Sequence, residues 1–169
     1  MNMQNPGLFK SFLIALGVLA VIALFVTGLG IIQLPNWPFI YFLFAFTGLA
    51  KVTKQGWVDT FVGAGIGLLV GLSSTIIGQF LGAAIGTVVM LVLVILLITG
   101  LVSGKFKYAN VPCMFTLTAI SAFIFTTPYA AVGGILLSFL IAAALFGVLV
   151  LVLASAGKKK ATNETTITN

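Results

Sequence analysis

Two Asn-x-Pro sequences are the places where this chain could offer polar groups to a solute. Asn36-Trp37-Pro38 and Asn110-Val111-Pro112 each open an apolar run. Proline suits the first turn of a helix because its missing N–H has no partner there, and an asparagine just before it can cap the free amides. If both helices dip inward, their positive ends converge on a polar pathway. The alternative is that each sequence only begins a helix at a membrane interface.

Hydroxyl side chains in the second of these runs could hydrogen-bond a passing solute. Thr116, Thr118 and Ser121 follow Asn110 and lie near Cys113. A hydroxyl can instead donate to a carbonyl of its own helix, which leaves it without a role in transport. The predicted solute pathway therefore consists of five side chains, Asn36, Asn110, Thr116, Thr118 and Ser121.

Asp59 has two candidate roles. It lies at one end of a predicted span near Lys51 and Lys54, which favours an ion pair at the membrane interface. The alternative is that it couples transport to protons or sodium. The interiors of the predicted spans contain no Asp, Glu, Lys, Arg or His, whereas ion-coupled pumps normally keep such residues at depth. The sequence therefore favours passage of an uncharged solute.

Several other chemistries lack their residues. The chain has no histidine, and its single cysteine, Cys113, excludes an intramolecular disulfide and any Cys-x-x-Cys motif. Neither a Ser–His pair, nor paired carboxylates, nor a Gly-rich phosphate loop is present. We therefore expect no enzymatic activity, no cofactor and no metal site. The lysines lie at the ends of apolar runs, which is not typical of a nucleic-acid-binding face.

The apolar runs themselves are typical of an integral membrane protein. Of the 169 residues, 61% are hydrophobic and 6% are charged, whereas about a quarter of the residues in a soluble domain are charged. The sequence predicts an all-α polytopic membrane protein with six transmembrane helices, at about 10–32, 37–50, 58–77, 80–102, 111–126 and 129–156. The second run rises only about 21 Å as a helix, which favours an interior position over a lipid-facing one.

The lysines predict the orientation of these six crossings. With the N-terminus in the cytoplasm, the loops at 33–37, 78–79 and 127–128 lie on the other side and contain no lysine. All eight lysines then lie on the cytoplasmic side: Lys10, Lys51, Lys54, Lys105, Lys107, Lys158, Lys159 and Lys160. The positive-inside rule therefore predicts two cytoplasmic termini and a multi-pass protein of the inner (plasma) membrane.

Three markers recur in the same order in the two halves of the chain. Thr27-Gly28 and Thr99-Gly100 close the first and fourth spans, at an offset of 72, and the Asn-x-Pro sequences recur at an offset of 74. A row of small residues recurs at an offset of 71, as Gly63, Gly67 and Gly71 and then as Gly134, Ser138 and Ala142. Because three crossings reverse the direction of the chain, the two three-helix repeats, at about 8–77 and 80–156, are predicted to be inverted.

The small-residue rows have two interpretations. They let a neighbouring backbone approach closely, so the direct interpretation is helix packing. The alternative is that they leave width for a narrow pore, and spans three and six could pack on each other about a pseudo-two-fold axis. The repeats form one predicted transmembrane domain, 1–157, and the polar residues 158–169 are expected to be a disordered cytoplasmic tail.

Part of the sequence resembles a known family. The segment from Leu34 to Gly71 resembles small bacterial inner-membrane proteins of unknown function, through Trp37, Phe39, Lys54-Gln55-Gly56 and the glycine row. Val111-Pro112, followed by Phe115 and Phe123, resembles the same family. The resemblance implies a bacterial inner membrane and little about the solute. The Asn-x-Pro pair is also similar to the Asn-Pro-Ala caps of aquaporins, but the alanine and the selectivity arginine are absent.

These observations predict a channel or facilitator for a small uncharged solute, such as urea, a short amide, ammonia or a neutral weak acid. The solute would pass between the inverted repeats, and the expected partners are that solute and the lipid bilayer. One alternative is a proton- or sodium-coupled transporter that uses Asp59. Another is a membrane subunit of a larger complex with no transport role. A homo-oligomer is compatible with the sequence because small channels commonly assemble symmetrically.

Overall fold

The chain folds into helices joined by short connections. The computed structural model describes residues 8–49, 52–121, 123 and 126–167. Within these residues the elements are α1 (Leu8–Ile31), α2 (Trp37–Phe44), the π-helix η1 (Ala45–Leu49), α3 (Lys54–Leu81), α4 (Ala83–Ser103), α5 (Val111–Ser121) and α6 (Tyr129–Ile167). The all-α prediction is confirmed for the part of the chain that the structure describes.

Three helices are long and apolar enough to cross a membrane. They are α3, α4 and the portion Tyr129–Val152 of α6, and they are compatible with the predicted membrane association. The apolar stretches Trp37–Leu49 and Val111–Ser121 are shorter. At 1.5 Å per residue they rise about 20 Å and about 16 Å, less than a hydrocarbon core of about 30 Å. Each of these two stretches is therefore shorter than a hydrocarbon core is thick.

The helix boundaries differ from the sequence prediction at three places. The turn expected at Gly78-Gln79 lies instead at Gly82, whose φ of +93° ends α3 and starts α4 one residue later. Glycine adopts this conformation without steric cost. The span predicted to reach residue 126 ends as a helix at Ser121, and residues 122, 124 and 125 lie outside the described residues.

The third difference concerns the tail. The helix α6 continues to Ile167 through residues that the sequence analysis assigned to a disordered tail, and residues 168–169 lie outside the described part. Residues 158–167 include no proline and no glycine. A helix that is already nucleated adds one hydrogen bond for each further residue, so nothing in this segment terminates it.

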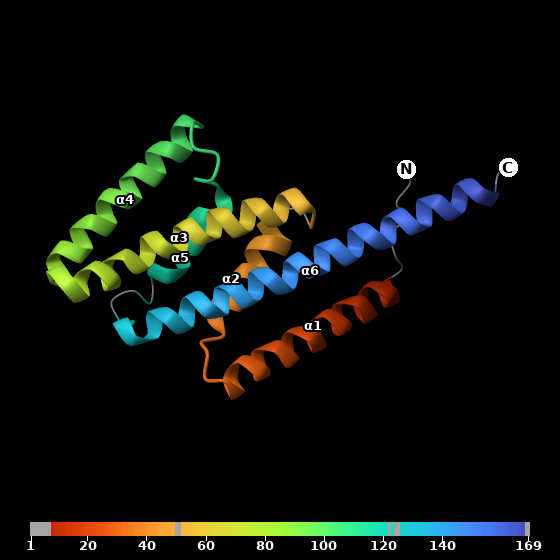
Figure 1. Ribbon diagram of the computed structural model, residues 1–169, viewed down its shortest axis with the longest axis horizontal. Helices are drawn as coiled ribbons and strands as arrows, with labels where there is room; N and C mark the ends of the chain where they lie inside the picture. Colours follow the sequence, from red (N-terminus) through yellow and green to blue (C-terminus); the bar gives the residue numbers. More distant parts are fainter. Residues whose placement is uncertain (1–7, 50–51, 122, 124–125, 168–169) are drawn as a thin grey trace.

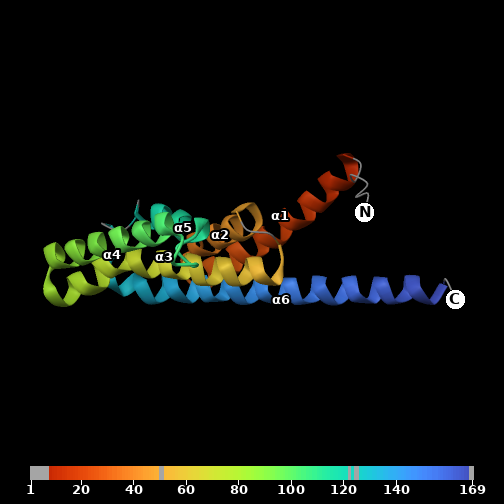
Figure 2. The same ribbon diagram turned by 90° about the horizontal axis from the view of Figure 1, so that it is seen from above.

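Successive helices alternate in direction along the long axis of the molecule, so the start of α1 and the end of α6 lie toward the same end (Figure 1). The long helices α3 and α6 contact each other. The short helix α5 packs on α3, α2 packs on α6, and α4 packs on the outer side of α3. Figure 2 shows α3 and α6 below α4, α5 and α2 in that view.

The glycine row of α3 brings α5 into close contact. A Cβ atom at Gly67 would collide with the carbonyl oxygen of Cys113, and one at Gly71 would collide with the Ile120 side chain. The obstacle at Gly67 is backbone, so no rotamer change can relieve it. The row therefore packs against α5 of the second half, and it does not meet the equivalent row of α6.

The equivalent row of α6 faces the segment that leads into α2. A Cβ atom at Gly134 would lie 3.3 Å from Cδ of Pro35. Ser138 and Ala142 continue the row and are fully buried. Each half therefore presents its small residues to the other half.

Aromatic side chains fill the rest of the α3–α6 and α2–α6 contacts. The indole Nε1 of Trp57 in α3 donates to the carbonyl oxygen of Ala143 in α6 at 2.8 Å. The rings of Phe61 and Phe139 stack between the same two helices with centroids 6.0 Å apart. The core is completed by three fully buried rings of α2 and η1 that pack on Phe146, namely Phe39, Phe42 and Phe46.

We expect Gly67→Ala to lower the free energy of unfolding by about 1–3 kcal/mol, because the added methyl group forces α5 away from α3. Gly65→Ala is the matched control on the same helix, since its Cβ would lie an ordinary 3.6 Å from the Phe139 ring. The measurement is the thermal midpoint of each purified variant in the same detergent. Equal midpoints for the two variants would contradict the close contact at Gly67.

Candidate functional site

A cavity of about 360 Å³ opens where the start of α3 meets the start of α5. We call it the Asp59 cavity. Its wall combines the end of η1, the first turns of α3 and the Asn110-Val111-Pro112 sequence, and its lining residues are Leu49, Thr53, Gln55, Gly56, Asp59, Asn110, Val111 and Pro112. One of the two predicted Asn-x-Pro sequences therefore does border a cavity that has polar side chains.

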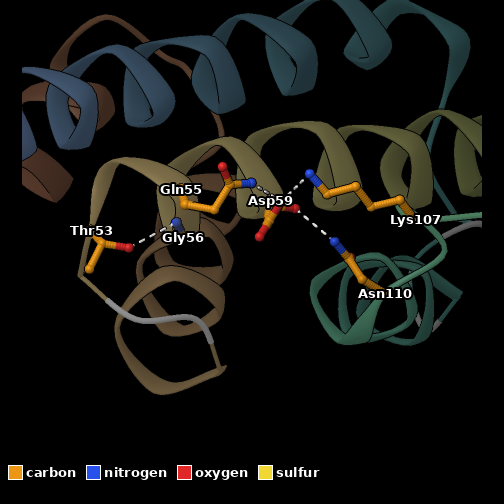
Figure 3. Close-up of polar contacts among 6 residues, drawn as sticks. All are labelled: Thr53, Gln55, Gly56, Asp59, Lys107 and Asn110. Carbon is orange, nitrogen blue, oxygen red and sulfur yellow. Dashed lines mark hydrogen bonds and ion pairs between the residues drawn. The ribbon is translucent and has the colours of Figure 1, made fainter.

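Asn110 joins α5 to α3 at this cavity. Its Oδ1 accepts from the backbone N–H of Cys113 at 3.0 Å, which caps the first turn of α5. Its Nδ2 donates to the backbone carbonyl of Asp59 at 3.0 Å (Figure 3). The side chain of Asn110 thus bonds at the same time to a free backbone N–H of α5 and to a backbone carbonyl of α3. Asn110 positions the two helices, and both polar atoms of its side chain already have protein partners.

The carboxylate of Asp59 has two partners on the same side of the cavity. Its Oδ1 accepts from Nε2 of Gln55 at 2.8 Å and lies 3.7 Å from Nζ of Lys107 (Figure 3). Asp59 therefore does form an ion pair, but its partner is Lys107 and not Lys54; its place at a membrane interface stays a prediction. Lys51 lies outside the described residues. The loop after α4 returns beside α3, so a lysine distant in sequence becomes the neighbour.

A second cavity, of about 520 Å³, lies between the end of α1, the start of α2 and the start of α6. We call it the Trp37 cavity, and its lining includes Gln33, Pro35, Trp37, Thr127, Ala130 and Gly134. Asn36 is exposed here and its side chain makes no capping hydrogen bond. The two asparagines of the repeated sequence therefore differ: Asn110 is held by α3, whereas Asn36 is not held by α6.

The two cavities lie at opposite ends of the α2–α5 pair. These helices run antiparallel, since the ring of Tyr41 meets that of Phe115 at 5.7 Å while Trp37 stacks on Phe123 at 5.8 Å. Consequently the start of α2 lies beside the end of α5. The positive ends of the two helices therefore lie at opposite ends of the α2–α5 pair, and their convergence on one polar pathway stays a prediction. Tyr41 and Phe115 are themselves offset by 74 positions, as Asn36 and Asn110 are.

The predicted pathway hydroxyls all bond to their own helix. Thr116 is buried and donates to the Pro112 carbonyl at 3.0 Å. Thr118 and Ser121 are exposed and donate to the carbonyls of Met114 and Thr118 at 2.8 and 2.6 Å. None of the three lines either cavity. The structure therefore brings Asn110 and Asp59 together and leaves these hydroxyls apart from them.

Two hydroxyls outside the predicted pathway have no hydrogen-bond partner. Thr60 Oγ1 and Ser138 Oγ are the buried side-chain oxygens without a partner among the residues that the structure describes. Sequence reasoning assigned Ser138 to packing alone and passed over Thr60. A signal for Thr60 did exist, because it continues the glycine row of α3 at helical spacing, after Gly56 and before Gly63.

Comparisons of the chain with protein-family models, curated proteins and solved structures found no significant match. The family resemblance noted from the sequence therefore stays a prediction. Within the described ranges, no group of three or more His, Cys, Asp or Glu side chains is arranged to hold a metal ion. The geometry of the two cavities carries the functional proposal.

We expect Asn110→Ala to lower the free energy of unfolding by about 1–2 kcal/mol, because the variant loses the cap of α5 and the bond to the Asp59 carbonyl. Asn36→Ala is the matched control at the equivalent Asn-x-Pro sequence, where the side chain caps nothing. Thermal unfolding of both variants in detergent measures the difference. If Asn36→Ala lowered the midpoint as much as Asn110→Ala, the proposed inequality of the two asparagines would be wrong.

Proposed function

We propose that the protein crosses a bacterial inner membrane six times, as two inverted three-helix repeats at about 8–77 and 80–156 with both termini in the cytoplasm. The alternating direction of the helices in Figure 1 supports six crossings. The lysine distribution supports this orientation, since Lys54 begins α3 and Lys105 and Lys107 follow α4, whereas the opposite end of the α3–α4 pair, at Gly82, carries no lysine. The Trp37 cavity then faces the periplasm and the Asp59 cavity faces the cytoplasm.

Reciprocal contacts support the inverted repeat. Gly63 of α3 packs on Asn110, which precedes α5, and Gly134 of α6 packs on Pro35, which precedes α2. The two pairs occupy equivalent places in the two halves. The Tyr41–Phe115 contact joins equivalent residues directly, as expected for a pair close to the pseudo-two-fold axis.

Within this arrangement we propose that the protein is a channel or facilitator for a small uncharged solute, such as urea, a short amide, ammonia or a neutral weak acid. The observation that carries the proposal is the pair of cavities at opposite ends of the α2–α5 pair. The helix interiors between them contain dipoles and aromatic rings but no carboxylate, lysine, arginine or histidine. Such a path opposes ions, which lose their hydration at a cost of several kcal/mol.

The place of Asp59 argues against ion coupling. The carboxylate is 33% exposed and bonds to Gln55 and Lys107 at one mouth. A coupling residue would sit near the midplane between the repeats. The alternative of a membrane subunit without transport is favoured by one observation, an apolar groove of about 330 Å³ between α1 and α6 that includes Leu24, Phe25 and Ile141. Co-purification with a stoichiometric partner, and no flux, would favour that alternative.

Proteoliposomes provide the test of transport. We expect protein-containing liposomes to conduct at least one of urea, acetamide, ammonia and acetic acid faster than empty liposomes, as measured by stopped-flow light scattering or an internal pH dye. Because nothing couples the movement to an ion, the rate should not change when an ionophore collapses the proton or sodium gradient. Uptake that stops with the ionophore and in Asp59→Asn would favour the coupled alternative, and no flux for any solute would refute the proposal.

Labelling in intact bacteria tests the orientation. Gln79 and Lys105 are both exposed; Gln79 lies in the last turn of α3, just before α4 begins, and Lys105 follows the end of α4. We expect a membrane-impermeant maleimide to label Gln79→Cys in intact cells and Lys105→Cys only after the cells are permeabilised. The native Cys113 is fully buried and serves as the unreactive background. Labelling of Lys105→Cys in intact cells would reverse the orientation.

A further inference from the structure

Two buried hydroxyls are left without a partner in an otherwise well-bonded interior. Thr60 and Ser138 are both fully buried, and neither Thr60 Oγ1 nor Ser138 Oγ has a hydrogen-bond partner among the described residues. An unpaired buried hydroxyl costs about 1–3 kcal/mol. Other hydroxyls of the helices avoid this cost, as when Ser73 donates to the Val70 carbonyl at 2.6 Å. The two hydroxyls therefore keep a donor and an acceptor free in this structure.

Neither hydroxyl lines either cavity, but each lies one helical turn from a glycine that does. Thr60 is one helical turn beyond Gly56, which lines the Asp59 cavity, in the direction in which α3 leaves that end of the molecule. Ser138 is one turn beyond Gly134, which lines the Trp37 cavity, in the direction in which α6 leaves the opposite end. Each unpaired hydroxyl thus marks the next step inward from one of the two cavities.

The neighbourhood of Thr60 has a second unusual feature. The π-helix η1 packs against both α3 and α5, and its last residue, Leu49, lines the Asp59 cavity. Short π-helical segments inside helices occur frequently at functional sites, because they widen the backbone and disturb its hydrogen-bond ladder. The π-helix η1 and the unpaired hydroxyl of Thr60 therefore both occur near the Asp59 cavity.

We propose that the hydroxyls of Thr60 and Ser138 are two solute-binding steps, one reached from each cavity. The proposal rests on the facilitator function and adds the chemical class of the solute. A hydroxyl both donates and accepts, so it suits a small neutral molecule that carries N–H or O–H groups, such as urea, a short amide or ammonia. A molecule without such groups gains nothing at either step. The two side chains, one in each half, then act as the polar selectivity contacts of the path.

The test compares hydroxyl removal at these positions with removal elsewhere. Thr60→Val and Ser138→Ala delete the unpaired groups and change the side-chain volume little. Thr99→Val and Ser73→Ala are the matched controls, because those hydroxyls already donate to carbonyls of their own helices. Each full-length variant is reconstituted at equal density, and urea, acetamide and ammonia flux is measured together with the thermal midpoint in detergent.

We expect Thr60→Val and Ser138→Ala each to reduce flux of the conducted solute by about three- to tenfold, the effect of one lost hydrogen bond. Their thermal midpoints should be equal to or higher than that of the wild type, since an unpaired buried hydroxyl has been removed. The control variants should keep the wild-type flux. A purely structural role cannot produce lower flux together with unchanged or greater stability.

Three results would overturn the inference. If the wild type conducts and both variants conduct at the same rate, the hydroxyls are not binding steps, although the facilitator function stands. If flux falls only together with a lower thermal midpoint, the hydroxyls support the fold and not the solute. If the wild type conducts none of the solutes, the facilitator function and this inference fail together.

Discussion

Two helices shorter than the hydrocarbon core of a bilayer impose the main constraint on this molecule. In lipid, the free amides and carbonyls at their ends need partners from the protein, so each short helix must lie against a longer one. The small-residue rows make this possible: Gly67 lets the backbone of α5 reach α3, and Gly134 lets Pro35 reach α6. Since each row packs against the short helix of the other half, or the segment before it, these contacts join the two halves of the chain.

The same construction gives two ends with different chemistry. At the Asp59 cavity, α3 supplies a carbonyl for Asn110 and a carboxylate for Lys107. At the Trp37 cavity, Ala130 and Thr127 line the wall and Asn36 remains exposed. The proposed repeat would therefore be close to symmetric in packing and asymmetric in charge. In the proposed function, a neutral solute would meet a charged entrance on one side only, while the interior on both sides would offer hydroxyls, rings and backbone.

Local sequence patterns predicted the helices, and long-range contacts decided the site. Hydropathy was sufficient for the helical segments because each apolar run is continuous, and the four-residue spacing identified the close-packed rows. The sequence could not predict which helix packs on the glycine row of α3, because α5 and α6 both follow α3 in the chain and both contact it. The two Asn-x-Pro sequences also contain one bonded and one exposed asparagine. They differ because α3 supplies a carbonyl to Asn110, whereas no neighbouring helix in the described part of the chain holds Asn36 in this way. The Gly82 turn and the Lys107 partner depend likewise on which segments return beside α3.

The exchange of partners between the halves has a consequence for biosynthesis. In the proposed membrane arrangement, α2 leaves the ribosome roughly 90 residues before α6, its main neighbour. At a synthesis rate of about 5–20 residues per second, this delay lasts about 5–20 seconds. During that interval the short helix has only its contacts with α1 and α3, such as the stacking of Phe25 on Phe39, and lacks the larger surface of α6. In that arrangement the first half completes its packing only after the second half has been synthesised, and α2 gains its main neighbour last.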